Sequence, residues 1–493
     1  MLCLHNAYTF IKVQGNRHGG LSCTDSWKVL DTTMSMHAPD ADLDAHESGL
    51  EGAPGAAKPR RVGAMRWGIA VLLFFGVLIN YFDRTNLSVT VGPLKSAFHL
   101  SAGDMGIVLS AFLWSYALMQ IPAGLLLDRI GIKWVLRTVT WLWACACLMT
   151  AVISGTGLLI ISRLLLGVAE SPVFPGAMKA TGYWFPRNER GLSTAVFDSG
   201  QRISNVIGTP LVALAVVTFG WRGAFWTTGV LSVVYAIVFW FSYRNPKEAR
   251  KSGRLSETEY AHIREGGAQH EEDLVPNPLA NLGYVLRRRK VWGLSIGLAC
   301  AGYTTWMLLT WLPGYLQTEM HMNVLSSGLY TAIPWLFAVI VEFIIPGWLV
   351  DHLIKRGKNP TIVRKTVLLI GMIVAIAVIG AAFTTQIGWA LLWITIATVG
   401  ITLAFSVSNS LPALIAPEGG VGAVASVMNF TNTLFGIAAP IVTGDTLQVT
   451  GGFAMAFVIA AVILAIGIFF YTWVLGPIEQ IPPSPKTVVV DAA

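Results

Sequence analysis

Apolar runs of membrane-spanning length recur along nearly the whole chain after residue 64. A helix needs about 20 apolar residues to cross roughly 30 Å of hydrocarbon. Polar breaks divide this sequence into twelve spans, in two sets of six. They are predicted at 65–90, 104–126, 134–153, 157–182, 191–218 and 221–243, then at 289–317, 325–350, 364–384, 388–412, 421–446 and 451–475. The pattern predicts an all-α membrane protein with twelve transmembrane helices in two six-helix bundles.

Polar stretches delimit the expected domains. Residues 1–64 lack hydrophobic periodicity and are predicted to be a disordered N-terminal extension; a misassigned start, with Met34, Met36 or Met65 as the first residue, is the alternative. The bundles are expected at 65–243 and 289–477, with a linker loop at 244–288 and a tail at 478–493. Within the linker, Ser256 to Glu259 has the form of a capping box, which predicts the start of a short helix.

Loop charge predicts the orientation. Four loops on one side are rich in Lys and Arg, whereas intervening loops such as 154–157, 384–388 and 448–452 carry none. The positive loops are 128–137, 187–190, 244–290 and 355–365. Lys and Arg accumulate on the cytoplasmic side of membrane proteins, so both termini and the linker are expected in the cytoplasm of a multi-pass inner (plasma) membrane protein.

Composition supports the membrane interpretation and excludes other classes. Of the 493 residues, 54% are hydrophobic and only 12% are charged, well below the share in soluble domains. The net charge of +7 lies in short loops between spans, which argues against nucleic-acid binding. The five cysteines have no metal-ligand spacing, and no nucleophile–base set, HExxH-type helix or phosphate-binding glycine loop is present. We expect no metal, no cofactor and no enzyme activity.

A short motif repeats at the same place in each half. Gly124 to Lys133 follows the second span, and Gly347 to Arg356, with the same Gly-x-Leu-x-Asp frame, follows the eighth. Glycine allows helices to approach closely, and Asp128 is expected to meet a helix N-terminus or a cation across the domain interface. The predicted gate residues are Gly124, Asp128, Arg129, Gly131, Lys133 and Asp351.

The first and fourth predicted spans contain four charged residues well inside the membrane, where each costs about 2.5–3.5 kcal/mol on insertion scales. Asp83 and Arg84 lie about 24 Å along the first span. Arg163 and Glu170, seven residues apart in the fourth span, share one helix face. They form either permanent salt bridges or a proton-coupling site. In the second case an anion arriving at Arg84 competes with Asp83 for that cation, and Asp83 takes up a proton.

The gate motif resembles that of the major facilitator superfamily. Two further segments resemble its anion:cation symporter branch, specifically bacterial carriers of aldonates, aldarates and hexuronates: Ile79 to Ser88, and Arg163 to Pro175 followed by Trp184 to Gly191. The resemblance covers about residues 65–477. It implies that Asp83 and Glu170 are the proton-coupling pair, that Arg163 controls Glu170, and that Arg84 holds the substrate carboxylate. It also implies substrate contacts at Tyr81, Tyr116, Gln201, Ser406, Ser408, Asn409 and Asn429; hydrogen bonding between helices is the alternative for each.

Arg202 departs from the expected pattern beside Gln201. It is predicted either to bind a second substrate carboxylate, favouring a diacid such as an aldarate, or to pair with Asp198 one turn away on the same helix. Glu342 is expected near the cytoplasmic end of the eighth span, as a partner within the gate, and Lys179 is expected to extend to the cytoplasmic surface.

Together these features predict a monomeric proton-coupled symporter that imports an organic anion by alternating access. The resemblance favours a sugar acid: a hexonate, hexuronate or aldarate. The alternatives are an exchanger, or a carrier of another carboxylate such as an aromatic or dicarboxylic acid. A transporter-like receptor is less favoured, because the linker loop is too short for a signalling domain.

Overall fold

The computed structural model describes residues 63–482, apart from 271–281, 343, 346–348, 418–419 and the side chain of Asp351. Most of the predicted N-terminal extension and tail lies outside these residues. Every regular element in the described part of the chain is helical.

The first bundle consists of long apolar helices joined by short turns. Its elements are α3 (Met65–Val89), α4 (Val91–Phe98), α5 (Ala102–Arg129), α6 (Ile132–Val152), α7 (Thr156–Glu170), α8 (Val173–Trp184), α9 (Arg190–Ile203), the π-helical turn η1 (Ser204–Gly208) and α10 (Thr209–Ser242). The loop that follows contains α11 (Pro246–Lys251), α12 (Glu257–Glu265) and α13 (Leu282–Val285).

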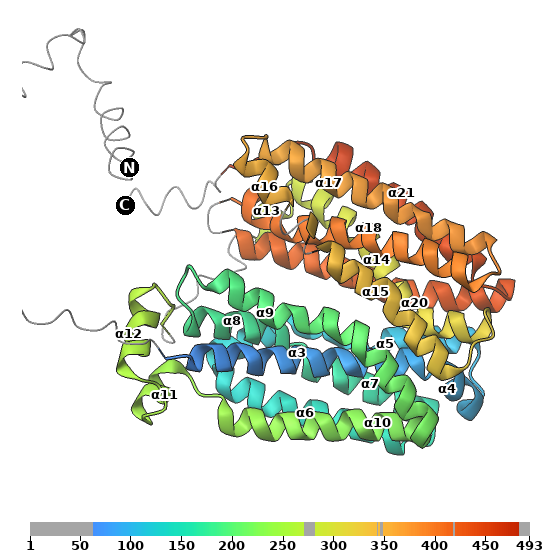
Figure 1. Cartoon of the computed structure of the whole chain (residues 1–493), viewed down its shortest axis with the longest axis horizontal. Coiled ribbons are helices and arrows are strands. Elements are labelled where there is room, and N and C mark those ends of the chain that lie inside the picture. Colours follow the sequence, from blue (N-terminus) through green and yellow to red (C-terminus); the bar gives the residue numbers. More distant parts are fainter. Residues whose placement is uncertain (1–62, 271–281, 343, 346–348, 418–419, 483–493) are drawn as a thin grey trace, which may run out of the picture. The chain divides into compact units, whose positions relative to one another are not determined.

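The second bundle repeats this arrangement. Its elements are α14 (Arg289–Thr318), α15 (Val324–Glu342), α16 (Val350–Lys355), α17 (Pro360–Ala375), η3 (Ile376–Phe383), α18 (Ile387–Ser410), α19 (Pro412–Ile415), α20 (Val421–Thr450), α21 (Ala454–Phe469) and η4 (Phe470–Val474). In Figure 1 the blue-to-green helices and the yellow-to-red helices form two separate groups that lie side by side.

Within the described residues, eleven helical stretches are long and apolar enough to cross a membrane. One of them, Arg190–Ser242, has 53 residues, which corresponds to roughly 80 Å and far exceeds a bilayer core. Gly220 interrupts this stretch with a φ of 72°, a conformation that favours glycine. It therefore holds two spans, divided where the sequence predicts a boundary, and the twelve-span prediction is confirmed.

The two bundles meet at the helix ends remote from the central loop; we call these the far end, and the opposite side the loop end. Two polar contacts cross there: Gly103 N donates to Gln448 Oε1 at 3.0 Å, and Gln317 Nε2 donates to the Val89 carbonyl at 3.2 Å. One cluster of buried apolar side chains also spans both bundles at this level, including Val91 of the first. The far end is thus held closed by apolar packing and by hydrogen bonds.

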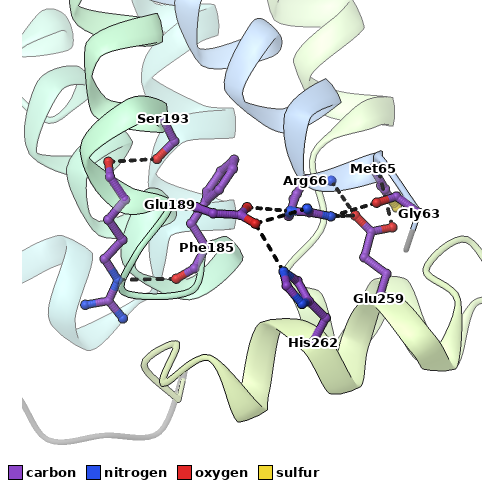
Figure 2. Close-up of polar contacts among 9 residues, drawn as sticks. Gly63, Met65, Arg66, Phe185, Glu189, Ser193, Glu259 and His262 are labelled. Carbon is purple, nitrogen blue, oxygen red and sulfur yellow. Dashed lines mark hydrogen bonds and ion pairs between the residues drawn. The ribbon is translucent and has the colours of Figure 1, made fainter. Parts of the chain in front are cut away.

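At the loop end, α12 is attached to the first bundle (Figure 2). The predicted helix start is confirmed, because Ser256 Oγ accepts from Glu259 N at 3.2 Å. The Glu259 carboxylate does not return to Ser256, as a capping box requires. It accepts instead from Met65 N and Arg66 N, at 3.3 and 3.1 Å, in the first turn of α3. A carboxylate there satisfies free N–H groups and the positive end of the helix dipole.

Arg66 joins this contact to the start of α9. Its Nε donates to Glu189 Oε2 at 2.8 Å and its Nη1 to Glu259 Oε1 at 3.2 Å, and His262 Nε2 lies 3.1 Å from Glu189 Oε1 (Figure 2). We call Arg66, Glu189, Glu259 and His262 the loop-end network. The hydrogen bond from Arg66 lowers the pKa of Glu189 below its ordinary value, because it stabilises the carboxylate.

Two of the predicted gate residues form ion pairs, one with a residue of the first bundle and one with a residue of the central loop. Asp128 pairs with Lys179 of α8 at 2.5 Å, and Lys133 pairs with Glu248 of α11 at 2.8 Å. The expectation that Asp128 crosses the domain interface is therefore wrong for this structure, because the Lys179 ammonium reaches its carboxylate from the same bundle.

The remaining gate residues are less constrained. Gly131, with a φ of 86°, makes the sharp turn between α5 and α6. Gly124 has open space where a side chain would lie, so it does not serve a close helix approach here. Arg129 is exposed. Asp351 belongs to α16, but its side chain lies outside the described residues.

Candidate functional site

A cavity of about 180 Å³ lies between the two bundles. Its walls are mostly apolar, with a few polar groups from both sides, as is usual for small-molecule sites. The polar lining includes Tyr81, Gln201 and Arg202 from the first bundle and Trp306, Glu342 and Asn432 from the second. The structure thus brings three of the predicted substrate residues together.

Arg84 does not line this cavity itself but contacts Tyr81, which does. Its Nη2 is 3.3 Å from Glu170 Oε2 and 3.1 Å from Asn80 Oδ1. The guanidinium carbon is 4.3 Å from the centroid of the Tyr81 ring and 5.4 Å from that of Tyr116. Aromatic faces attract a cation without neutralising it, so Arg84 retains charge for an anion. Tyr116 lies beside Arg84 but is not part of the cavity wall.

Asp83, although adjacent to Arg84 in sequence, lies in a different environment. Its Oδ2 accepts from Trp143 Nε1 at 2.5 Å and from Ser232 Oγ at 3.4 Å, and the residue is 2% exposed. Successive helix residues point about 100° apart and do not face each other. The expectation that Asp83 and a substrate compete for Arg84 is therefore wrong: the carboxylate paired with Arg84 is Glu170.

Arg163 is buried two turns before Glu170 but does not pair with it. Its Nη2 donates to Thr150 Oγ1 at 2.5 Å, and its guanidinium carbon lies 5.4 Å from the centroid of the Phe225 ring. Any control of Glu170 by Arg163 in this arrangement acts through space rather than through a hydrogen bond.

These four residues, Asp83, Arg84, Arg163 and Glu170, form what we call the embedded cluster. Their formal charges cancel, but their hydrogen bonding is incomplete. In the described part of the chain, Asp83 Oδ1, Glu170 Oε1 and Arg163 Nε are buried without a partner. A buried polar atom without a hydrogen bond costs about 1–3 kcal/mol. The cluster is therefore not a set of fully formed salt bridges.

Arg202 has two carboxylate partners. Its Nη1 lies 2.7 Å from Asp198 Oδ2 on the same helix, which confirms the predicted i, i+4 pair. Its Nη2 donates to Glu342 Oε1 of the other bundle at 2.5 Å, and its Nε also contacts that carboxylate. Glu342 was expected near the gate; it lies instead in the cavity wall.

The predicted residues of the tenth and eleventh spans divide into several groups. Ser408 is buried and hydrogen-bonds the Tyr471 hydroxyl at 2.7 Å, which is the interhelical alternative. Asn409 and Asn429 are exposed and outside the cavity wall. Ser406 lies close to the Glu342 carboxylate.

Asn432 interrupts the same apolar helix as Asn429 and is a pocket candidate on that ground, but the resemblance does not assign it to the site. It lines the cavity, and its Oδ1 has no hydrogen-bond partner among the described residues. Asn432 lies three residues beyond Asn429 on α20, and of these two amides it is the one that lines the cavity.

Comparison with known proteins agrees with this architecture. The family model of the Major Facilitator Superfamily matches residues 73–440. The uncharacterized transporter YybO of Bacillus subtilis is 41% identical over 86% of this chain and 97% of its own length. The D-galactonate transporter of Escherichia coli O6:H1 is 31% identical over 86% and 98%. An inward-facing bacterial homologue of the lysosomal transporter Spinster has a similar fold, with a TM-score of 0.67, 17% identity, and coverage of 84% and 98%.

Proposed function

This chain belongs to the Major Facilitator Superfamily, and from that premise we propose that it is a proton-coupled symporter importing a sugar acid by alternating access. Its membrane is the inner (plasma) membrane, and the central loop faces the cytoplasm, consistent with the positive loops on that side. Because the far end is closed by apolar packing, we assign this structure to the inward-facing state of the proposed cycle.

The observation that carries this proposal is the Arg84–Glu170 pair beside the cavity. A substrate carboxylate has the same chemistry as the Glu170 carboxylate and can take its place on Arg84. Glu170, fully buried and deprived of its cation, is then strongly disfavoured as an anion and takes up a proton. Anion binding and proton binding are coupled at one guanidinium.

Asp83 supplies a second protonation site in the same scheme. It faces Trp143 and Ser232 rather than the substrate, so its proton is held away from the anion. Arg163 contributes a positive field to both acids without pairing with either one. Asp83 and Glu170 can then change protonation between the outward and inward states, as a proton-driven carrier requires.

Two further observations support a sugar acid as the anion. The amides of Gln201 and Asn432 line the cavity, and amides both donate to and accept from hydroxyl groups. Among the relatives is a protein named as a D-galactonate transporter. We therefore take D-galactonate as the first substrate to test.

The experiment is uptake of labelled D-galactonate into proteoliposomes with an acidic exterior. Each coupled proton provides about a tenfold concentration gradient per pH unit. Wild-type protein should accumulate substrate and lose this on addition of a protonophore. Glu170→Gln and Asp83→Asn should abolish accumulation while retaining exchange of internal for external substrate.

Glu257→Gln, at an exposed carboxylate of the central loop, is the matched control and should behave as wild type. Wild-type accumulation that persists with a protonophore, or full accumulation by Glu170→Gln, would contradict the proposal.

A further inference from the structure

Two arginines at the cavity each pair with a protein carboxylate. Arg84 is paired with Glu170 next to the cavity, and Arg202 is paired with Glu342 in its wall. Tyr81 connects the two regions, because its ring is 4.3 Å from the Arg84 guanidinium carbon and it lines the cavity together with Arg202. Each arginine thus holds a protein carboxylate where a ligand carboxylate could bind.

The charges around Arg202 are not balanced. Asp198 and Glu342 place two carboxylates on one guanidinium, for a net charge of −1 when all three groups are ionised. A ligand carboxylate approaching Arg202 would meet this excess negative charge. Protonation of Glu342 removes the excess and leaves Arg202 shared between Asp198 and the ligand, so anion entry and proton uptake are linked.

Few other groups affect Glu342. The ionisable side chains facing it are Arg202 and Asp198 of α9, with Tyr81 of α3 farther away; Ser406 of α18 also lies near the carboxylate. In the described part of the cavity wall, no other Asp, Glu, His, Lys or Arg is present. The local charge balance therefore depends on these three groups.

The position of the pair gives it a second consequence. Arg202 belongs to the first bundle and Glu342 to the second, so the ion pair spans the cavity between the two halves. Exchange of Glu342 for a ligand carboxylate therefore replaces a protein contact between the bundles with a contact made by the ligand. A monoacid held by Arg84 alone leaves this connection intact.

We propose that Arg202 and Glu342 form the subsite for the second carboxylate of a sugar diacid, with Glu342 as an exchangeable placeholder that takes up a proton when the diacid binds. This inference rests on the proposed function and extends it: the carrier distinguishes dianionic from monoanionic sugar acids, and each diacid brings one proton more than a monoacid. Glu342 is a specificity-determining residue in this account.

Calorimetry on purified protein tests this without transport. Titrations of D-galactonate and of galactarate, the corresponding diacid, in buffers of different ionisation enthalpy give the number of protons taken up with each ligand. Wild-type protein should take up one proton more with galactarate. Glu342→Gln should remove this difference. Arg202→Gln should weaken galactarate binding about ten- to hundredfold, as expected for loss of hydrogen bonds to a charged group, and change galactonate binding less than about threefold.

Arg202→Gln leaves two carboxylates without their cation and could unfold, so the double variant Arg202→Gln/Glu342→Gln provides a neutral version with the same expected preference for the monoacid. Glu257→Gln, at an exposed carboxylate of the central loop far from this charge balance, is the matched control and should retain the extra proton. Equal proton uptake with both ligands in wild type, or equal weakening of both ligands in the double variant, would overturn this inference while leaving the proposed function standing. Binding of neither acid to wild-type protein would overturn both.

Discussion

The loop-end network and the embedded cluster are built from the same chemistry, arginines and carboxylates, but differ in how completely they are bonded. In the network both oxygens of Glu189 and both oxygens of Glu259 accept hydrogen bonds. In the cluster, Asp83 and Glu170 each keep one buried oxygen without a partner among the described residues. Full bonding fixes a contact, whereas partial bonding in a low-dielectric environment leaves charges that respond to a new partner. The loop-end network therefore holds α12 against the first bundle, whereas the embedded cluster can exchange one charged partner for another.

The largest effect is expected from removing the arginine that pairs with Glu170 in the cluster. Arg84→Gln leaves Glu170 buried without its cation, and breaking a buried pair in this way costs about 3–5 kcal/mol. Uptake should be lost, and thermal unfolding should move to a lower temperature. The double variant Arg84→Gln/Glu170→Gln should recover most of the stability but none of the uptake. A double variant as unstable as the single one would mean that Glu170 is not the partner that matters.

Packing around the cluster can be disturbed without changing its charges. A Cβ at Gly167 would overlap the Phe112 carbonyl oxygen and Ser115 Oγ of α5. Gly167→Ala should therefore push α7 away from α5, displace Glu170 from Arg84, and cost about 1–3 kcal/mol by overpacking. Thermal unfolding and uptake measure both consequences.

Gly191 of α9 provides the control at the loop end. It has no neighbour within 4 Å of an added Cβ, so Gly191→Ala should leave uptake unchanged and stability equal or slightly higher. Similar losses in the two variants would show that the cluster has no special need for close helix packing.

A smaller effect is expected from the corresponding arginine at the loop end. Arg66→Gln leaves Glu259 bonded to two backbone N–H groups and Glu189 in contact with His262. The loss should be about 1–2 kcal/mol, typical of hydrogen bonds to charged groups, and uptake should remain within about twofold of wild type. Uptake reduced as severely as in Arg84→Gln would erase the distinction between the two regions.

The smallest effect concerns acidity at the loop end. Because Arg66 lowers the pKa of Glu189 below its ordinary value of 4.5, the stabilisation is complete above that pH and disappears as the pH falls through the lower folded-state value. For this partly exposed pair it should be below about 1 kcal/mol. The difference in melting temperature between wild type and Glu189→Gln should shrink as the pH falls below about 4.5, through the lower folded-state pKa of Glu189. A difference that already shrinks between pH 7 and pH 5 would indicate that another group titrates.

The sequence was sufficient for the fold and for the positions of the buried charges. Hydrophobic runs count spans directly, and even the division at Gly220 was visible as a polar, glycine-containing break. The embedded charges were recognisable because an ionised group in an apolar helix is expensive wherever its helix packs.

The sequence did not show which side chains contact each buried charge. Asp83 and Arg84 point to different neighbours because their directions depend on helix rotation, which the sequence does not specify. The resemblance favoured Asn429 over Asn432; both interrupt α20 one turn apart, and only the packing of the bundles shows that Asn432 is the one that lines the cavity. Glu342 was placed near the gate because span ends are uncertain by several residues, whereas its contact with Arg202 depends on how the bundles meet.

The most direct test of the account is an infrared difference spectrum of purified protein recorded on addition of D-galactonate, compared between wild type and Glu170→Gln. If a substrate carboxylate displaces Glu170 from Arg84, a carbonyl band of a protonated carboxylic acid should appear in wild type and be absent in the variant. Substrate binding with no such band in wild type, or with the same band in Glu170→Gln, would contradict the claim that Glu170 exchanges its cation for a proton.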